Sequence, residues 1–265
     1  MQRGLRKGLC RMNPTTLRGI KLANDLPFSV KPIIDITDQL PKNPKGDWLH
    51  MPIKRKNGRL EVGPRPFNDI THISVHHTAT EGGTPQGHAN YHISKGDGGI
   101  AYHIYIKGDQ IYQVNDLLAF TWHTQSNNYQ TIGIAVEGNF TKRDLTDAER
   151  KCLYAAIITV MDIFNIPVEN VKGHGEFVPT ACPGYDTNRV RKDIRDILIE
   201  REYRKTAEYR ASAIVDLYAR VEHLYRMYLN KEKYWEDAER KLFTMYQLAT
   251  DYELMSPKQA GKSYP

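Results

Sequence analysis

The chain has 265 residues, of which 40% are hydrophobic and 26% charged, and its formal net charge is +6. This length and composition are ordinary for a soluble protein with one sizeable domain plus appendages, or with two small domains. No apolar run approaches the roughly 20 residues that a membrane-spanning helix needs, so no membrane span is predicted. The positive charge is spread along the chain without a basic run interleaved with aromatic residues, and a nucleic-acid partner is therefore not predicted.

Residues 1–66 are rich in Pro, Lys, Arg and Asn and show no sustained hydrophobic period. We interpret them as an irregular N-terminal arm that lies against the domain. The first residues are basic but lack the apolar stretch of an export signal, so no export signal is predicted. The three cysteines, Cys10, Cys152 and Cys182, show no disulfide spacing, and a disulfide framework is not expected.

The stretch THISVHHTAT predicts the first strand of the domain. Ile73 and Val75 alternate with polar residues, which is the period of a strand with one face in the core. Because side chains on a strand alternate between faces, His76 and His77 should point in opposite directions. His77 shares the apolar face and is expected to be packed or hydrogen-bonded, whereas His76 is free to act as a ligand.

Further strands and a short helix follow in chain order. A helix is predicted over 84–95, with Thr84 as its cap. A hairpin with strands over 100–107 and 111–114 comes next, and a third strand covers 131–138.

A longer helix is predicted between Thr146 and Asn165. Thr146 and Glu149 have the spacing of a capping box, and one apolar stripe follows them: Leu153, Ala156, Ile157, Val160 and Phe164. Asp186 can cap a last helix, whose apolar positions are Val190, Ile194, Ile197 and Leu198. Helices of this kind are expected to pack on the sheet.

After about residue 205, apolar residues recur in steps of three and four, and the rhythm repeats after Asn230. This pattern predicts a helical hairpin or a coiled-coil segment with charged residues on its outer face. Two interpretations stay open. The segment is either an appendage packed on the domain, or a module for oligomerisation or docking.

The loop NVKGHGEFVPTACPGY holds the residues best suited to bind a metal. His174 and Cys182 lie among Gly and Pro in an irregular stretch, and an imidazole with a thiolate makes a plausible zinc half-site. A third ligand must come from elsewhere, and His76 is the candidate. By residue type alone, a surface histidine and a buried thiol would be an equally good interpretation.

Four segments resemble the type-2 N-acetylmuramoyl-L-alanine amidases, the family of the T7-like phage lysozymes and the peptidoglycan recognition proteins. They are VHHTAT, GGIAYHIYIKGDQIYQV, WHTQSNNYQTIGIAVEGNF and GHGEFVPTACPG, and they occur in the family's order with similar spacings. The resemblance covers about residues 69–200. It implies an α/β fold with a central mixed β-sheet flanked by helices.

The resemblance also implies roles for individual residues. It makes His76, His174 and Cys182 the ligands of one Zn²⁺ ion. Tyr102 matches a catalytic tyrosine that donates a hydrogen bond to the oxyanion or holds the attacking water. His123 matches a histidine near the site, and we expect it to contact substrate.

Two positions depart from relatives in this family. Thr180 stands where many phage members have a lysine, two residues before the cysteine. Its hydroxyl can hydrogen-bond a developing oxyanion but supplies no positive charge. Ala135 stands where a cytoplasmic branch has a catalytic glutamate, and Glu137 is a weak substitute, so the group that accepts the proton of water is not predicted.

Together these observations predict a zinc amidase domain over 67–203. It would cleave the bond between N-acetylmuramic acid and L-alanine in bacterial peptidoglycan. Residues 1–66 form the arm, and 204–265 form a helical segment for docking, wall binding or oligomerisation. The expected context is a phage or prophage lysin, either a free endolysin or a tail-associated enzyme. It would lie in the host cytoplasm before lysis or on the virion, with a second copy or a virion protein as possible partners.

Two alternatives remain at this stage. The first is a peptidoglycan-binding or structural virion protein that uses the same fold without catalysis. The second is a cysteine hydrolase that uses Cys182 with His174, and it would keep its activity after metal removal.

Overall fold

The structure is a computed structural model that describes residues 14–50, 53–54, 60–61 and 63–229. The chain divides into two compact units, residues 1–197 and 198–265. Among the described residues, no helix is long and apolar enough to cross a bilayer.

Unit 1 is built on a mixed sheet of six strands in the order β1-β6-β5-β7-β4-β8. β5 and β6 form an antiparallel hairpin, whereas the other four pairings in this sheet are parallel. The predicted central mixed sheet is thereby confirmed. Its strands are β1 (Ile34–Asp35), β4 (His72–His77), β5 (Ile104–Lys107), β6 (Gln110–Gln113), β7 (Thr131–Val136) and β8 (Val171–Gly173), and β2 (Ile53–Lys54) pairs separately with β3 (Leu60–Glu61).

β4 lies between β7 and β8 and is buried on both faces from Ile73 onward. The alternation in its sequence predicted burial of one face alone, but parallel strands inside a sheet are usually covered on both sides. His77 accepts a hydrogen bond from the backbone N–H of Phe140 at 3.2 Å, which confirms the expectation of a packed or hydrogen-bonded side chain. His76, on the other face, is buried as well.

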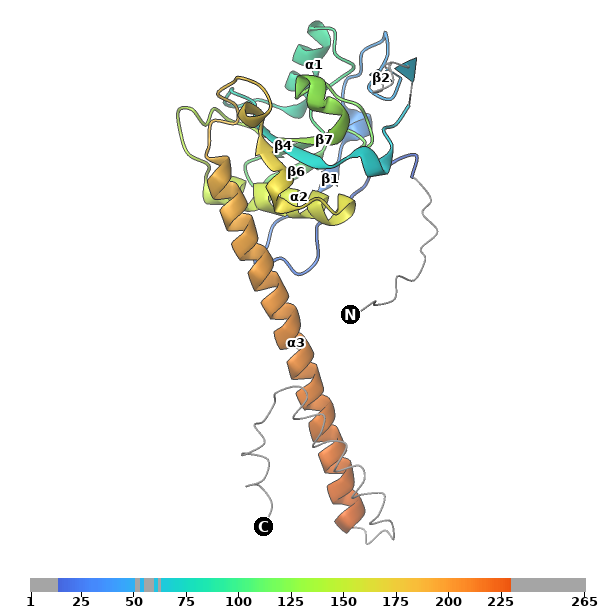
Figure 1. The fold of residues 1–265 in the computed structure, drawn as a ribbon, viewed down its shortest axis with the longest axis vertical. Helices are drawn as coiled ribbons and strands as arrows, with labels where there is room; N and C mark the ends of the chain where they lie inside the picture. The colour runs from blue at the N-terminus through green and yellow to red at the C-terminus, as the bar shows by residue number, and fades with distance from the viewer. Residues whose placement is uncertain (1–13, 51–52, 55–59, 62, 230–265) are drawn as a thin grey trace, which may run out of the picture. The chain divides into compact units, whose positions relative to one another are not determined.

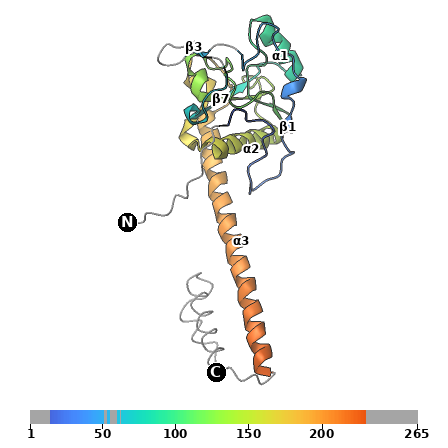
Figure 2. The same cartoon turned by 90° about the vertical axis from the view of Figure 1, so that its right-hand side faces the viewer.

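The two helices α1 (Pro85–Ser94) and α2 (Asp147–Phe164) cover opposite faces of the sheet (Figures 1 and 2). The Thr84 hydroxyl caps α1 by accepting the N–H of Gly87 at 3.0 Å. α2 begins with the predicted capping box of Thr146 and Glu149 and packs against β5, β6 and β7. The described residues of unit 1 also form five short 3-10 helices: η1 (Thr37–Gln39), η2 (Phe67–Asp69), η3 (Gln125–Gln130), η4 (Val168–Asn170) and η5 (His174–Glu176).

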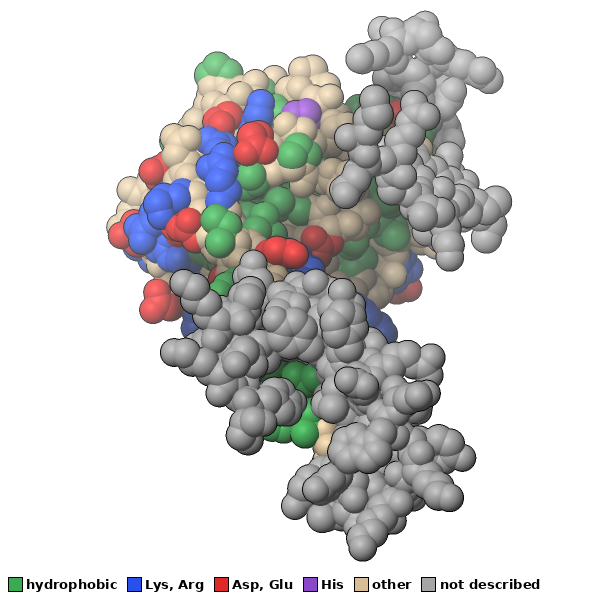
Figure 3. All heavy atoms as spheres, turned by 60° about the horizontal axis from the view of Figure 1, so that its bottom comes forward, with side chains coloured by type: hydrophobic (Ala, Val, Ile, Leu, Met, Phe, Trp, Pro, Cys, Tyr) green, Lys and Arg blue, Asp and Glu red, His purple; other side chains and the backbone are tan. Residues whose placement is uncertain are grey.

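The surface of unit 1 carries charges of both signs close together. Figure 3 shows Lys and Arg side chains interspersed with Asp and Glu side chains on one face. Arg143 pairs with Glu81 at 3.1 Å and with Glu149 at 2.9 Å, which ties the loop before α1 to the start of α2.

The described part of the N-terminal arm contains only short elements, and one of them, β1, belongs to the edge of the sheet. β1 pairs in parallel with β6, and the backbone N–H of Ile20 donates to the side chain of Gln113 at 3.1 Å. The N–H of Leu17 donates to the carboxylate of Asp116 at 3.0 Å. The arm therefore closes an edge that would otherwise expose unpaired backbone groups.

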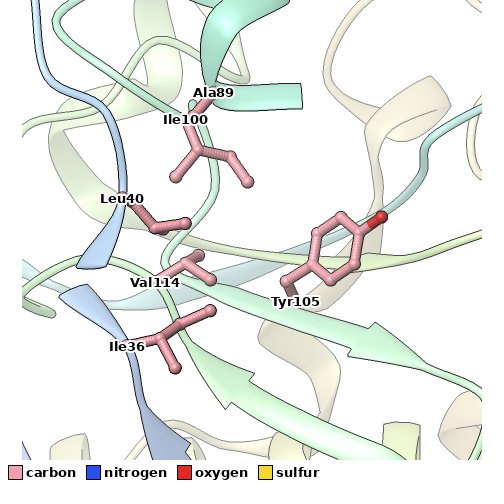
Figure 4. Close-up of a cluster of buried hydrophobic side chains, with 6 residues drawn as sticks. All are labelled: Ile36, Leu40, Ala89, Ile100, Tyr105 and Val114. Carbon is pink, nitrogen blue, oxygen red and sulfur yellow. The ribbon is translucent and has the colours of Figure 1, made fainter. Parts of the chain in front are cut away.

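One cluster of buried side chains joins the arm, α1 and the hairpin (Figure 4). In it the Tyr105 hydroxyl points away from the aliphatic side chains and lies 3.1 Å from His88 Nδ1. Burial of each large aliphatic side chain contributes about 1.5–3 kcal/mol, so this cluster fixes the arm to the domain. Its members are Ile36, Leu40, Ala89, Ile100, Tyr105 and Val114.

α3 runs without interruption over Thr187–Leu229. Asp186 accepts the N–H of Asn188 at 2.8 Å, as expected of the predicted cap. Val190 and Ile194 are buried in unit 1. The second apolar run of the predicted hairpin, after Asn230, lies outside the described residues.

Candidate metal centre

His76 is presented to the site by β4, the strand next to the sheet edge that β8 forms. It sits near the end of β4, where its register partner on the neighbouring strand β7 is Ala135. Its ring centroid lies 4.6 Å from that of His174 and 5.2 Å from that of Tyr102. The rings of His174 and Tyr102 thus both lie beside that of His76.

His174 comes directly after β8, at the start of η5. Glu176 fixes this turn because its Oε1 accepts the backbone N–H of Gly173 at 2.9 Å and the Thr187 hydroxyl at 2.7 Å. Arg191 of α3 donates to the same carboxylate at 2.9 Å. The turn that carries His174 is thereby bound to the first turns of α3.

Cys182 returns to the same point through a tight contact with Gly175. The N–H of Gly175 donates to the carbonyl of Cys182 at 2.8 Å. A Cβ atom at position 175 would lie 2.8 Å from the carbonyl oxygen of Thr180, which is too close for any residue but glycine. The Cys182–Pro183 peptide bond is cis.

The structure brings the three predicted ligands together. One ligand atom each from His76, His174 and Cys182 lies within 4.8 Å of the others, and Cys182 Sγ is 3.7 Å from His76 Nδ1. A tetrahedral zinc ion holds sulfur and nitrogen ligands about 3.5 Å apart, so the donor atoms need to move little. Two imidazoles and one thiolate fit zinc, and they leave a fourth position for water or substrate.

Burial sets the protonation of these ligands before a cation binds. It lowers the pKa of His76 well below its ordinary value and also lowers the pKa of His174. Burial raises the pKa of the Cys182 thiol to about 11, although the backbone N–H of His77 donates to its sulfur and acts in the opposite sense. The imidazoles are therefore neutral near pH 7, as metal ligands must be, and the thiol has one proton to lose.

Tyr102 lies beside His76 in a half-buried position. Its ring also packs edge-on against His92, with centroids 5.7 Å apart. Its backbone carbonyl accepts a hydrogen bond from the Asn115 amide at 2.6 Å. Burial raises the pKa of the phenol above its usual value, so the hydroxyl keeps its proton and can act as a donor at neutral pH.

The chain is similar to known amidases and endolysins. The sequence model of the N-acetylmuramoyl-L-alanine amidase family matches residues 66–185, which include all three candidate ligands. The endolysin of Escherichia phage T7 is 26% identical over 140 residues, which cover 49% of this chain and 90% of that protein. The endolysin N-acetylmuramoyl-L-alanine amidase LysCS of Clostridium intestinale has a similar structure, with a TM-score of 0.50 and 25% identity over 63% of this chain and 97% of that one.

This domain belongs to the N-acetylmuramoyl-L-alanine amidase family. In the amidase domain, Thr180 is exposed and accepts the N–H of Cys182 on its hydroxyl at 3.3 Å, so its own proton is free to be donated. Glu137 accepts the N–H of Gly83 at 2.8 Å and is engaged in the loop before α1.

His123, for which the sequence predicted a contact with substrate, lies against His76 in the amidase domain. Only 7% of its surface is exposed, and its Nδ1 lies 3.0 Å from His76 Nε2. The adjacent Trp122 is 43% exposed and packs its ring against Trp48, with centroids 5.4 Å apart. On this loop, the side chain of Trp122 is thus exposed, whereas that of His123 is buried.

Arg65 supports the same loop of the amidase domain and was not predicted from the sequence. It is 1% exposed and donates to the backbone carbonyls of Leu117, Asn128 and Thr131 at 2.7, 2.9 and 2.7 Å. Burial lowers the pKa of its guanidinium to about 9, and the charge of Asp116 partly opposes that effect. Nothing in the segment GPRPF distinguishes this arginine from those of a solvated linker.

Proposed function

We propose that the protein is a zinc-dependent amidase that cleaves the bond between N-acetylmuramic acid and L-alanine in bacterial peptidoglycan. The observation that carries the proposal is the convergence of His76, His174 and Cys182 to within 4.8 Å of one another in a domain of the amidase family. The phage origin of its endolysin relatives supports a role as a phage or prophage lysin.

Each side chain of the site then has a chemical role. When bound to His76, His174 and Cys182, zinc would polarise the amide carbonyl and lower the pKa of the attacking water. Tyr102 donates a hydrogen bond to the oxygen on which negative charge develops. The Thr180 hydroxyl is the second candidate donor, because it accepts the N–H of Cys182 and keeps its own proton for donation.

The structure argues against a cysteine hydrolase at the same site. A nucleophilic cysteine works as the thiolate, and reactive cysteines have lowered pKa values. Here the pKa of Cys182 is raised to about 11, and burial lowers the pKa of both neighbouring imidazoles, which disfavours an imidazolium–thiolate pair. This environment suits a thiol that ionises when a cation binds.

The test compares the two free cysteines that the structure describes. Cys182→Ala should abolish zinc binding and the release of new N-terminal alanine from wall sacculi. Cys152→Ala is the matched control, because Cys152 is 1% exposed within α2, and this variant should keep both properties. Wild-type protein should bind about one zinc ion per chain.

Each alternative predicts a different result. A cysteine hydrolase would release alanine after complete removal of zinc by a chelator. A non-catalytic wall-binding protein would bind sacculi without releasing alanine, in the wild type as in Cys182→Ala. Either result would contradict the proposed function.

A further inference from the structure

His76 uses its two ring nitrogens in two different directions. Its Nδ1 lies 3.7 Å from Cys182 Sγ, whereas its Nε2 lies 3.0 Å from His123 Nδ1. An imidazole binds a metal through an unprotonated nitrogen, so coordination through Nδ1 requires the proton of the neutral ring to be on Nε2. That proton points at His123.

We infer that His123 is a positioning residue that selects the metal-binding tautomer of His76, and that it does not contact substrate. Its Nδ1 accepts the proton of His76 Nε2 and so keeps Nδ1 of His76 free for the metal. The inference rests on the proposed zinc site, and it explains why a histidine occupies a buried position on this loop.

The contacts beyond His123 agree with this direction of hydrogen bonding. If its Nδ1 accepts, the proton of His123 must be on Nε2, which lies 3.3 Å from the hydroxyl oxygen of Thr131. That hydroxyl donates in turn to the backbone carbonyl of Asn127 at 2.9 Å. Every proton in this series of hydrogen bonds then has an acceptor, and the series ends on a carbonyl oxygen, which can only accept.

The Thr124 hydroxyl oxygen also lies 2.5 Å from His123 Nδ1, so the single lone pair of that nitrogen is shared between the Thr124 hydroxyl and His76 Nε2–H. The reverse arrangement would place the proton on Nδ1 of His123 and point it at Nε2 of His76. His76 would then carry its own proton on Nδ1 and could not bind the metal through that atom.

The position of the His123 ring is set from several sides. A Cβ atom at Gly133 would lie 2.9 Å from the ring, so only glycine permits this approach of β7. The His103 ring packs edge-on at a centroid distance of 5.5 Å, and the backbone N–H of His123 donates to the Asn128 side chain at 2.9 Å. Arg65 fixes the backbone of Asn128 as well. Such outer contacts orient a ligand only if they are rigid.

The experiment compares two substitutions at this position. His123→Leu removes the acceptor, and zinc affinity measured by chelator competition should fall roughly 10- to 100-fold. His123→Asn places an amide oxygen near the position of Nδ1 and should restore zinc affinity to within about threefold of wild type. His88→Leu is the matched control, since His88 contacts Tyr105 and the cap of α1, and it should bind zinc like wild type.

The outcomes separate this inference from the proposed function. Wild-type protein that binds no zinc would overturn the proposed function and the inference with it. If wild type binds zinc and His123→Leu binds it equally well, the inference alone fails. A raised KM for sacculi with unchanged zinc affinity would also overturn it, because His123 would then contact substrate.

Two further measurements keep the inference testable if His123→Leu does not fold. Thr131→Val removes the next acceptor in the chain, and zinc affinity should fall roughly two- to tenfold. An unchanged zinc affinity would contradict the proposed series of hydrogen bonds. In zinc-loaded wild type, ¹⁵N NMR should show the protons of His76 and His123 on Nε2, and a proton on Nδ1 of His123 would overturn the inference.

Discussion

Tyr102 is the residue whose proposed role differs most clearly from metal binding. Its ring lies 5.2 Å from that of His76, and burial keeps its hydroxyl protonated. Tyr102→Phe should lower kcat/KM on sacculi by about 10²–10³, the usual effect of losing one oxyanion donor. Its zinc affinity should stay close to that of wild type, because the hydroxyl is not a ligand.

The control for this change is Tyr91→Phe. Tyr91 is 59% exposed on α1, with Lys95 above its ring, and this variant should have wild-type activity. Equal activity of Tyr102→Phe and wild type would remove Tyr102 from the mechanism. Loss of zinc from the Tyr102→Phe variant would mean that Tyr102 affects activity by supporting the metal site.

The pH dependence of zinc affinity reports the protonation of the ligands. The pKa values of His76 and His174 are lowered, so both are neutral above about pH 7, whereas Cys182 has a raised pKa of about 11. Each zinc ion should therefore displace one proton. The logarithm of the apparent association constant should rise by about one per pH unit between about pH 7 and pH 9. A flat profile in competition titrations would mean that Cys182 is already a thiolate.

For individual residues, the sequence predicted which histidine on the strand lies at the candidate metal centre better than it predicted which side chains are buried. Strand alternation distinguished His76 from His77, because period two places consecutive side chains on opposite faces whatever the tertiary structure. The burial of His123 could not be predicted, since it depends on the approach of Gly133 and on a loop held by Arg65. Contacts of this kind arise only when distant segments pack.

Among the elements, the N-terminal arm should be required for stability. A chain that begins at Gly63 would lack β1 and also Trp48, which is buried and donates to the carbonyl of Ile100 at 2.8 Å. Loss of a buried Trp alone typically costs about 3–5 kcal/mol. Urea unfolding should show a clearly lower midpoint for the truncated chain, and Trp48→Ala should reproduce much of the change. Equal midpoints would show that the arm contributes nothing to folding.

The described part of α3 in unit 2 carries apolar residues on its surface. They are Ile199, Tyr203, Ile214, Val215, Tyr218 and Val221. Together with the steps of three and four in the sequence, they predict association with a second copy of the chain. Light scattering should give a mass above one chain for residues 1–265 and of one chain for residues 1–203. A monomer in both cases would contradict this prediction.

The main elements were predictable where local signals are strong. The capping box of Thr146 and Glu149 marked the start of α2, and the apolar period marked its length. β1 was not predictable, because two residues in a Pro-rich stretch have no period and become a strand only through pairing with β6. The continuity of α3 through residue 205 was also missed, since the change in apolar pattern there does not interrupt the helix.

At the scale of the whole molecule, the amidase domain occupies less than half of the chain, at residues 66–185. The match to the phage T7 endolysin covers 90% of that protein but 49% of this chain, so the flanks of this chain lie outside it. The net charge of +6 favours approach to an anionic wall, although charge of this size gives no specificity.

The central claim is that His76, His174 and Cys182 hold a zinc ion that is required for amide cleavage. The most direct measurement follows new N-terminal alanine and new reducing sugar ends released from sacculi, before and after zinc removal and zinc return. The account predicts alanine without reducing ends, loss of the signal when zinc is removed, and recovery when about one equivalent is returned. Alanine release that persists in metal-free protein, or the appearance of reducing ends instead, would contradict it.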